Sequence, residues 1–293
     1  MKVGVQLPEV ERQVSWSELR DMSRLIEDGG LDSVWVGDHV IYHRGGEWIG
    51  PWEAWTTMAA IAAVTTRIEI GPLVAPTAFS PPIVMAKRAA ALDEISNGRF
   101  VLGLGAGSDR TDFDAAGVPF AERAVRFEEA FTIIRTLFAA GEIDFEGQFH
   151  TVVNGKLHPR PRTDGGPPIM IGSTGPRILR ASLPYVARWN AWFMQYDNDP
   201  AIAADLLRWV DEQAELAGRT GPRVEKTLCS LFQFGDNPLR HGAKNPLVGP
   251  DAQLAALDGF REIGVDHLHL VLDPITIETI DSAADLVARW RNG

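Results

Sequence analysis

Residues 31–39 read LDSVWVGDH, and the fold can be inferred outward from this stretch. An apolar, β-branched run ends at Gly37, and Asp38 and His39 follow at once, which predicts a strand with an acid/base pair after its last residue. In parallel α/β proteins the chemistry gathers at the carboxyl ends of the strands. The competing interpretation is a loop Asp that caps the next turn beside a surface His.

Segments typical of strands and helices alternate on both sides of this stretch. The first strand, residues 2–7, is followed by apolar positions at helical spacing between Ser15 and Gly29. Eight such pairs of a strand and a helix predict one α/β domain, residues 1–293, with a (β/α)8 TIM-barrel fold. The other predicted strands are 34–36, 67–71, 100–104, 168–172, 189–194, 227–234 and 268–272, and the later helices include 122–140, 200–217, 251–263 and 275–290.

Two segments are expected to interrupt this alternation. Residues 143–152, with Gly147 at their centre, predict a small hairpin inserted after the fourth helix. Residues 108–119 are expected to form a long loop.

The composition is that of a globular protein without a face that binds nucleic acid. Of the 293 residues, 45% are hydrophobic and 23% are charged, and a net charge of -11 disfavours binding of a phosphate backbone. Cys229 is the sole cysteine, which excludes internal disulfides and is consistent with a reducing cytoplasm. The chain begins in a strand and has no apolar run of membrane-spanning length, so we expect neither a signal peptide nor a membrane partner.

Glycines after the fourth predicted strand are candidates for ligand contact. Gly103, Gly105 and Gly107 have the spacing that opens a dinucleotide-binding loop, but Ser108 occupies the place of the third glycine of that motif. We therefore favour the simpler interpretation, in which small residues at a strand end let a ligand approach the backbone.

The segment after the fifth predicted strand is a candidate phosphate site. Ser173 and Thr174 supply hydroxyls, Arg177 supplies a positive charge, and the start of the next helix supplies free backbone donors. An ordinary helix cap with a surface Arg is the equal alternative.

His267 and His269 lie two residues apart on the last predicted strand, so their side chains point the same way. Such a pair permits metal ligation, but no third ligand is evident in the sequence. We therefore favour packing or hydrogen bonding for both residues and expect no metal site.

Several stretches together resemble the bacterial luciferase-like monooxygenase superfamily, and within it the branch that uses the deazaflavin coenzyme F420. They are the opening strand, ALDEISNGR at 91–99 running into the glycines of 103–107, FDAAGVP at 113–119, and PPIMIGSTGP at 167–176. The Asp-His pair of the deazaflavin enzymes matches Asp38 and His39. The resemblance spans nearly the whole chain and favours F420 over FMN.

The resemblance implies that a flavin or deazaflavin ring lies in the mouth of the barrel, with its phosphate at the loop after the fifth strand. It also implies a non-proline cis peptide around Leu73-Val74, behind the ring, and a homodimer. The residues expected to bind the cofactor are Asp38, Leu73, Val74, Gly107, Gly172, Ser173, Thr174 and Gly175.

Two positions depart from the pattern of these relatives. Sugar-phosphate dehydrogenases of the deazaflavin branch carry a catalytic glutamate where this chain has Ser108, so their reaction is not implied here. Many relatives read DGWN where residues 187–190 read ARWN, a change expected to alter the surroundings of the cofactor's side chain.

Three functions follow from these patterns. The first is an oxidoreductase that moves a hydride between F420 and a small organic substrate, with His39 as acid/base and Asp38 orienting His39 or contacting the cofactor. The second is an FMN-dependent luciferase-like monooxygenase, because both reactions use the same fold. The third is a protein that binds a flavin without turnover. His43 is the nearest alternative to His39 as the acid/base.

Overall fold

Parallel strands form a nearly closed barrel in the computed structural model, which describes residues 1–9, 11–44, 46–235 and 245–293. β5 and β6 are two parts of one segment that pairs with β2 on one side and β7 on the other, so eight strand positions close the ring within these ranges. The predicted α/β TIM-barrel fold is confirmed. Around the wall the order is β5 (Glu69–Pro72), β2 (Ser33–Val36), β1 (Lys2–Gln6), β14 (His267–Asp273), β12 (Glu225–Gln233), β11 (Arg188–Ala191), β10 (Ile169–Gly172), β7 (Leu102–Gly105) and β6 (Ala75–Pro76).

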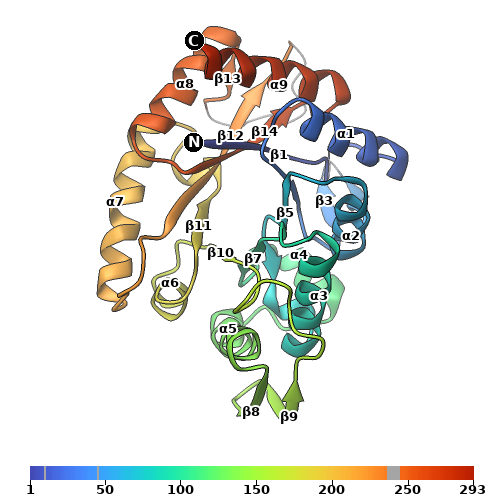
Figure 1. Cartoon of the computed structure of the whole chain (residues 1–293), viewed down its shortest axis with the longest axis vertical. Helices are drawn as coiled ribbons and strands as arrows, with labels where there is room; N and C mark the ends of the chain where they lie inside the picture. Colours follow the sequence, from blue (N-terminus) through green and yellow to red (C-terminus); the bar gives the residue numbers. More distant parts are fainter. Residues whose placement is uncertain (10, 45, 236–244) are drawn as a thin grey trace.

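Helices lie on the outside of this wall (Figure 1). Each barrel strand is followed by a helix, and the chain returns to the amino end of the next strand, as parallel pairing requires. The helices are α1 (Trp16–Asp28), α2 (Ala54–Val64), α3 (Pro82–Ile95), α5 (Arg123–Ala140), α6 (Pro176–Ser182), α7 (Pro200–Leu216), α8 (Pro250–Glu262) and α9 (Ile277–Asn292).

Additional elements decorate this frame. The hairpin predicted after the fourth helix is present as β8 (Glu142–Glu146) and β9 (Thr151–Lys156), which project beyond α5 in Figure 1. The segment expected to be a loop contains a short helix, α4 (Arg110–Ala116), because Asp109 caps its first turn and Gly117, at φ 68°, ends it. The remaining pieces are the hairpin β3 (Tyr42–Arg44) and β4 (Glu47–Ile49), β13 (Leu247–Val248), and the 3-10 turns η1 (Thr77–Phe79) and η2 (Phe193–Gln195).

The motif at 91–99 closes the end of a neighbouring helix. The Arg99 guanidinium donates to the carbonyls of Ala62 at 3.0 Å and Thr65 at 2.9 Å, at the end of α2. The last carbonyls of a helix have no partner within the helix, so Arg99 satisfies groups that burial would otherwise leave unpaired.

Two separate apolar cores stabilise the barrel. The larger lies between strands and helices and contains the outward-facing residues of each strand. The smaller lies inside the barrel and consists of Trp35, Val101 and Met170, with Leu73 and Val74 packed against it. This inner core separates the amino ends of the strands from their carboxyl ends.

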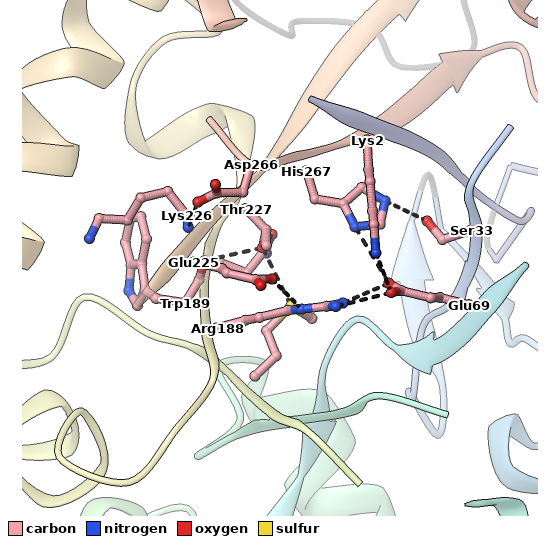
Figure 2. A network of polar contacts seen from close by, with 12 residues as sticks. Lys2, Ser33, Glu69, Arg188, Trp189, Glu225, Lys226, Thr227, Asp266 and His267 are labelled. Atoms are coloured by element: carbon pink, nitrogen blue, oxygen red, sulfur yellow. Dashed lines mark hydrogen bonds and ion pairs between the residues drawn. The ribbon is translucent and has the colours of Figure 1, made fainter. Parts of the chain in front are cut away.

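A polar network closes the amino end of the barrel (Figure 2). Arg188 donates to both oxygens of Glu69, at 2.7 and 3.0 Å, and to Glu225 at 2.8 Å. Because β5 and β11 are not neighbours in the sheet, the contact between Arg188 and Glu69 crosses the barrel interior. Six of the residues labelled in Figure 2 are the first residues of their strands: Lys2, Ser33, Glu69, Arg188, Glu225 and His267.

One residue of the stretch 187–190 can be placed directly. Arg188, the arginine of ARWN, lies at the amino end of β11 and bonds to Glu69 and Glu225, while the expected effect of the stretch on the cofactor's side chain stays a prediction. The inner core separates Arg188 from the carboxyl ends, so this residue builds the base of the barrel. Strand β11 also ends at Ala191, earlier than the predicted 194, because η2 begins at Phe193.

Within the described ranges, none of the helices has both the length and the hydropathy needed to span a lipid bilayer.

Candidate active site

A cleft of about 1230 Å³ opens at the carboxyl ends of the barrel strands. Its walls come from segments that are far apart in sequence and meet because the strands are parallel. Most of the predicted site residues line it, whereas Asp38 does not. The lining residues among them are His39, Leu73, Val74, Gly107, Gly172, Ser173, Thr174 and Gly175.

The floor of the cleft is Val74 surrounded by glycines. The Leu73-Val74 peptide is cis, which confirms the expectation from the resemblance. A Cβ atom at Gly103, Gly105 or Gly172 would lie only 3.1, 2.8 or 2.8 Å from a methyl carbon of Val74. The strands therefore need glycine at these positions, and together they leave an apolar cradle against which a planar ring can pack. A flavin or deazaflavin ring fits this arrangement.

His39 lines the cleft and is held by Asp112, which is 73 positions away in sequence. Nδ1 of His39 lies 2.5 Å from Oδ2 of Asp112, while Oδ1 accepts the backbone N–H groups of Val40 at 2.9 Å and Ile41 at 3.0 Å. The imidazole also packs against the ring of Tyr42, with 4.5 Å between centroids. Since Nδ1 is engaged, Nε2 is the ring nitrogen left to meet a ligand.

The surroundings of His39 raise its pKa above the ordinary value. Burial alone would lower the pKa, but the hydrogen bond with Asp112 and the negative charges of Glu9, Asp112 and Asp38 outweigh burial. Burial raises the pKa of Asp112, yet the hydrogen bonds from His39 and from two backbone amides bring it below its ordinary value. The pair thus favours an ionised carboxylate beside an imidazole whose pKa is raised, which suits proton transfer.

Asp38 lines an adjoining cavity of about 380 Å³, which His39 also borders. There the indole Nε1 of Trp55 donates to Oδ2 of Asp38 at 3.2 Å, and burial raises the pKa of Asp38 to about 6. Asp38 and His39 follow the end of β2 at Val36, and their hydrogen-bond partners come from different segments. The orientation of His39 that was predicted for Asp38 comes instead from Asp112.

The loop after β10 lines the cleft, but part of the predicted phosphate cradle has other partners. The backbone N–H of Gly175 donates to Ser173 Oγ at 3.0 Å. The Arg177 guanidinium donates to both oxygens of Glu128, each at 2.7 Å, in an exposed ion pair. The hydroxyls of Ser173 and Thr174 therefore border the cleft, while the positive charge of Arg177 is shared with Glu128.

Gly107 allows α4 to pack beside the end of β7. It adopts φ 82°, and a Cβ atom there would lie 2.5 Å from the ring of Phe113. Phe113 is fully buried, with the rings of Phe79 and Phe120 each 5.1 Å away. This packing places Asp112, the residue before Phe113, against the segment that follows β2.

Among the cleft residues that the sequence interpretation missed are Asp112 and Gln6. For Asp112, the sequence feature that could have indicated a site residue is a carboxylate in the first helical turn after the glycines of 103–107. Gln6, at the end of β1, is buried, lines the cleft and has an Oε1 atom without a hydrogen-bond partner among the described residues. A single Gln at a strand end carries no signal of its own.

The other histidines singled out in the sequence lie outside the cleft. The ring of His43 packs on Trp48, with 4.7 Å between centroids. The rings of His267 and His269 stack inside the barrel with 4.6 Å between centroids, and His267 also hydrogen-bonds to Ser33, in agreement with the packing or hydrogen bonding that the sequence favoured. In the part of the chain that the structure describes, no group of three or more His, Cys, Asp or Glu side chains is placed to hold a metal ion.

Comparison with known proteins points to one family. The model of the luciferase-like monooxygenase family matches residues 1–240. The chain is 33% identical over 263 residues to an F420-dependent glucose-6-phosphate dehydrogenase of Amycolatopsis mediterranei, an alignment that covers 87% of this chain and 76% of that protein. A dehydrogenase of the same name from Nocardia farcinica is 29% identical over 286 residues, covering 93% and 79%.

Solved structures share the fold at lower identity. A monooxygenase from Streptomyces bottropensis superposes with a TM-score of 0.81 at 22% identity, covering 99% of this chain and 98% of that one. The coenzyme F420 dependent tetrahydromethanopterin reductase from Methanopyrus kandleri superposes with a TM-score of 0.79 at 17% identity, covering 99% and 100%.

Proposed function

Because the chain belongs to the luciferase-like monooxygenase family, we propose that it is an oxidoreductase that transfers a hydride between coenzyme F420 and a small organic substrate. The observation that carries this proposal is the placement of His39 in the cleft, with Nδ1 on Asp112 and Nε2 left over. Relatives named as F420-dependent dehydrogenases support the choice of cofactor.

Coenzyme F420 supplies, when bound, a ring that accepts or donates a hydride. In this chain the cradle of Val74 and its neighbouring glycines would hold the ring, and the segment Gly172 to Gly175 would hold the phosphate. Leu73 and Gly107 border the same cleft. Asp38 would act from the adjoining cavity, and a direct contact with the cofactor is part of the proposal.

His39 would handle the proton that accompanies the hydride. When a hydride reaches a carbonyl carbon, the oxygen becomes negative and takes a proton, and the reverse reaction removes that proton. Nε2 of His39 is available for either step, and its carboxylate partner stabilises the protonated ring.

We do not propose the substrate of the sugar-phosphate dehydrogenases for this chain. Ser108 occupies the place of their catalytic glutamate and lines the cleft, so the chain lacks that carboxyl group at that point. Tyr42, Phe79 and Trp192 add aromatic surface to the same walls, which suits a small organic substrate with apolar parts.

Two alternatives belong to the same fold. An FMN-dependent monooxygenase would use the glycine cradle equally well, because the cradle recognises a planar ring and not its chemistry. A protein that binds a flavin without turnover would need the cradle but not the pair formed by His39 and Asp112. We favour the hydride-transferring oxidoreductase over a protein without turnover because only a reaction needs the pair of His39 and Asp112, which two distant segments assemble.

The test is a calorimetric titration of the protein, and of His39→Asn, with F420 and with FMN. We expect F420 to bind with micromolar or tighter affinity, about 8 kcal/mol, and FMN much more weakly. The variant should bind F420 as the wild type does, while its single-turnover rate with an accepted alcohol or carbonyl substrate falls by roughly two to four orders of magnitude.

Each outcome has a clear meaning. A preference for FMN would favour the monooxygenase. Normal turnover by the variant would remove His39 from the proton transfer, and thermal melts of both proteins serve as the control for folding.

We also propose a homodimer in the cytoplasm. Sedimentation of the purified protein would measure the oligomeric state directly.

A further inference from the structure

We propose that Asp112 is the positioning residue for His39: it sets which ring nitrogen carries the proton and presents Nε2 to the cleft. The inference rests on the proposed function for its catalytic meaning, but the contact itself can be tested without cofactor. The sequence alone pointed to the adjacent Asp38 for this role, and the resemblance to the family did not include Asp112.

The two oxygens of Asp112 perform two different tasks. Oδ2 is 2.5 Å from Nδ1 of His39, and Oδ1 accepts the backbone N–H groups of Val40 and Ile41. The carboxylate thus binds both the imidazole and the segment that carries it. Its side chain is only 3% exposed, so water does not compete for these bonds. An ionised carboxylate offers only acceptors, and therefore Nδ1 must carry the hydrogen and Nε2 is the free basic nitrogen.

Other charged groups near His39 have different partners. Asp38 accepts from Trp55, and Arg123 donates to the carbonyl of Gly107 at 3.2 Å. Glu9 accepts from the hydroxyl of Tyr42 at 3.3 Å, and Tyr42 itself meets His39 through its ring face. Glu9 and Asp38 act on His39 through their charge, whereas the hydrogen bond to the ring comes from Asp112.

The position of Asp112 depends on the packing of its neighbour in α4, Phe113. Phe113 is buried against Phe79 and Phe120, and Gly107 leaves room for its ring. The loop after β7 therefore orients the acid/base group that follows β2. A group that acts through His39 in this way should change the protonation of His39 more than the stability of the fold.

The experiment is an NMR titration of histidine ring resonances in the protein without cofactor. His39→Asn identifies the His39 signal by its loss. In the wild type, at a pH well above the His39 pKa that the titration itself measures, we expect nitrogen-15 shifts of a neutral ring protonated at Nδ1. In Asp112→Asn we expect the pKa of His39 to fall by about one unit or more, because the stabilising negative charge is gone. Asp112→Glu should restore part of the shift.

Asp109→Asn is the matched control. Asp109 caps the same helix and loses the same charge on substitution, and Asn caps a helix as well as Asp does. The His39 pKa should change little in this variant. Turnover should fall at least about tenfold in Asp112→Asn, with the pH profile displaced to lower pH, and should remain near the wild-type level in Asp109→Asn.

Two results would overturn the proposal. One is a folded Asp112→Asn protein whose His39 pKa equals that of the wild type. The other needs no variant: a neutral wild-type His39 protonated at Nε2 contradicts the assignment outright, even if the variant fails to fold. Failure of F420 to bind, with the NMR results as expected, would count against the proposed function alone.

Discussion

The imidazole of His39 is hydrogen-bonded at Nδ1, and this leaves Nε2 available to a ligand in the cleft. Asp112 supplies the hydrogen bond at Nδ1 from a segment 73 residues away. Asp38, the neighbour in sequence, instead accepts from Trp55 in the adjoining cavity. The acid that bonds to His39 is therefore found by proximity in space and not by proximity in sequence.

Asp38 should make stability depend on pH. Burial raises its pKa to about 6, so the folded protein binds a proton more tightly than the unfolded chain. The stabilisation is present below the ordinary pKa and is lost as the pH rises through about 6. Asp38→Asn removes the buried charge, so we expect a gain of up to about 3 kcal/mol at pH 7.5 and little gain at pH 4.

Urea unfolding of the protein without cofactor, at both pH values, measures this difference. A variant equally stabilised at pH 4 and pH 7.5 would show that the charge of Asp38 is not the cause.

At the scale of elements, short segments after the strands build the site and the strands hold them apart. Helix α4 lies where the sequence predicted a loop. The prediction failed because the two capping residues, Asp109 and Gly117, enclose only seven residues, which is too short for a clear helical pattern. The cradle formed by Val74 and its neighbouring glycines requires β7 and β10 to carry glycine at the positions that face Val74. Neither feature is visible in hydrophobic periodicity, which reports on faces of longer elements.

The segment from Gly172 to Gly175 can be tested with a pair of matched variants. A Cβ atom at Gly175 would meet Ser173 Oγ at 3.4 Å and Ile178 at 3.8 Å, which are ordinary contacts, so substitutions there should fold. Gly175→Asp places a negative charge where we propose the phosphate and should weaken F420 binding by tenfold or more, whereas Gly175→Asn, of similar size, should weaken it far less. Equal affinities in the titration would place the phosphate elsewhere.

At the scale of the whole molecule, the barrel separates stability from chemistry. The amino end is closed by ion pairs between first residues of strands, the middle by the core of Trp35, Val101 and Met170, and the carboxyl end remains open. Burial raises the pKa of Glu69, but its bonds with Arg188 and Lys2 bring it below the ordinary value. This end can therefore be rigid while loops at the other end vary.

Arg188→Met tests the contribution of that network to stability. The substitution leaves Glu69, 19% exposed, without its bidentate partner, and removing one member of a buried pair costs about 3 kcal/mol or more. Arg177→Met is the control, because it breaks an exposed bidentate pair with Glu128 and should change stability little. Urea unfolding of both variants gives the comparison, and equal losses would mean that burial of the network is unimportant.

The sequence by itself determined the barrel and the family pattern, and most of the site residues that it predicted, His39 among them, line the cleft. Alternating strands and helices leave few ways to bury their apolar faces, and parallel strands bring their carboxyl ends together. Only the tertiary structure decided that Asp112, and not Asp38, bonds to His39, and that Arg188 faces Glu69 across the base of the barrel. Such pairings depend on which side chains come together once the barrel has formed. The separation of two residues along the sequence does not give the distance between them in the folded protein.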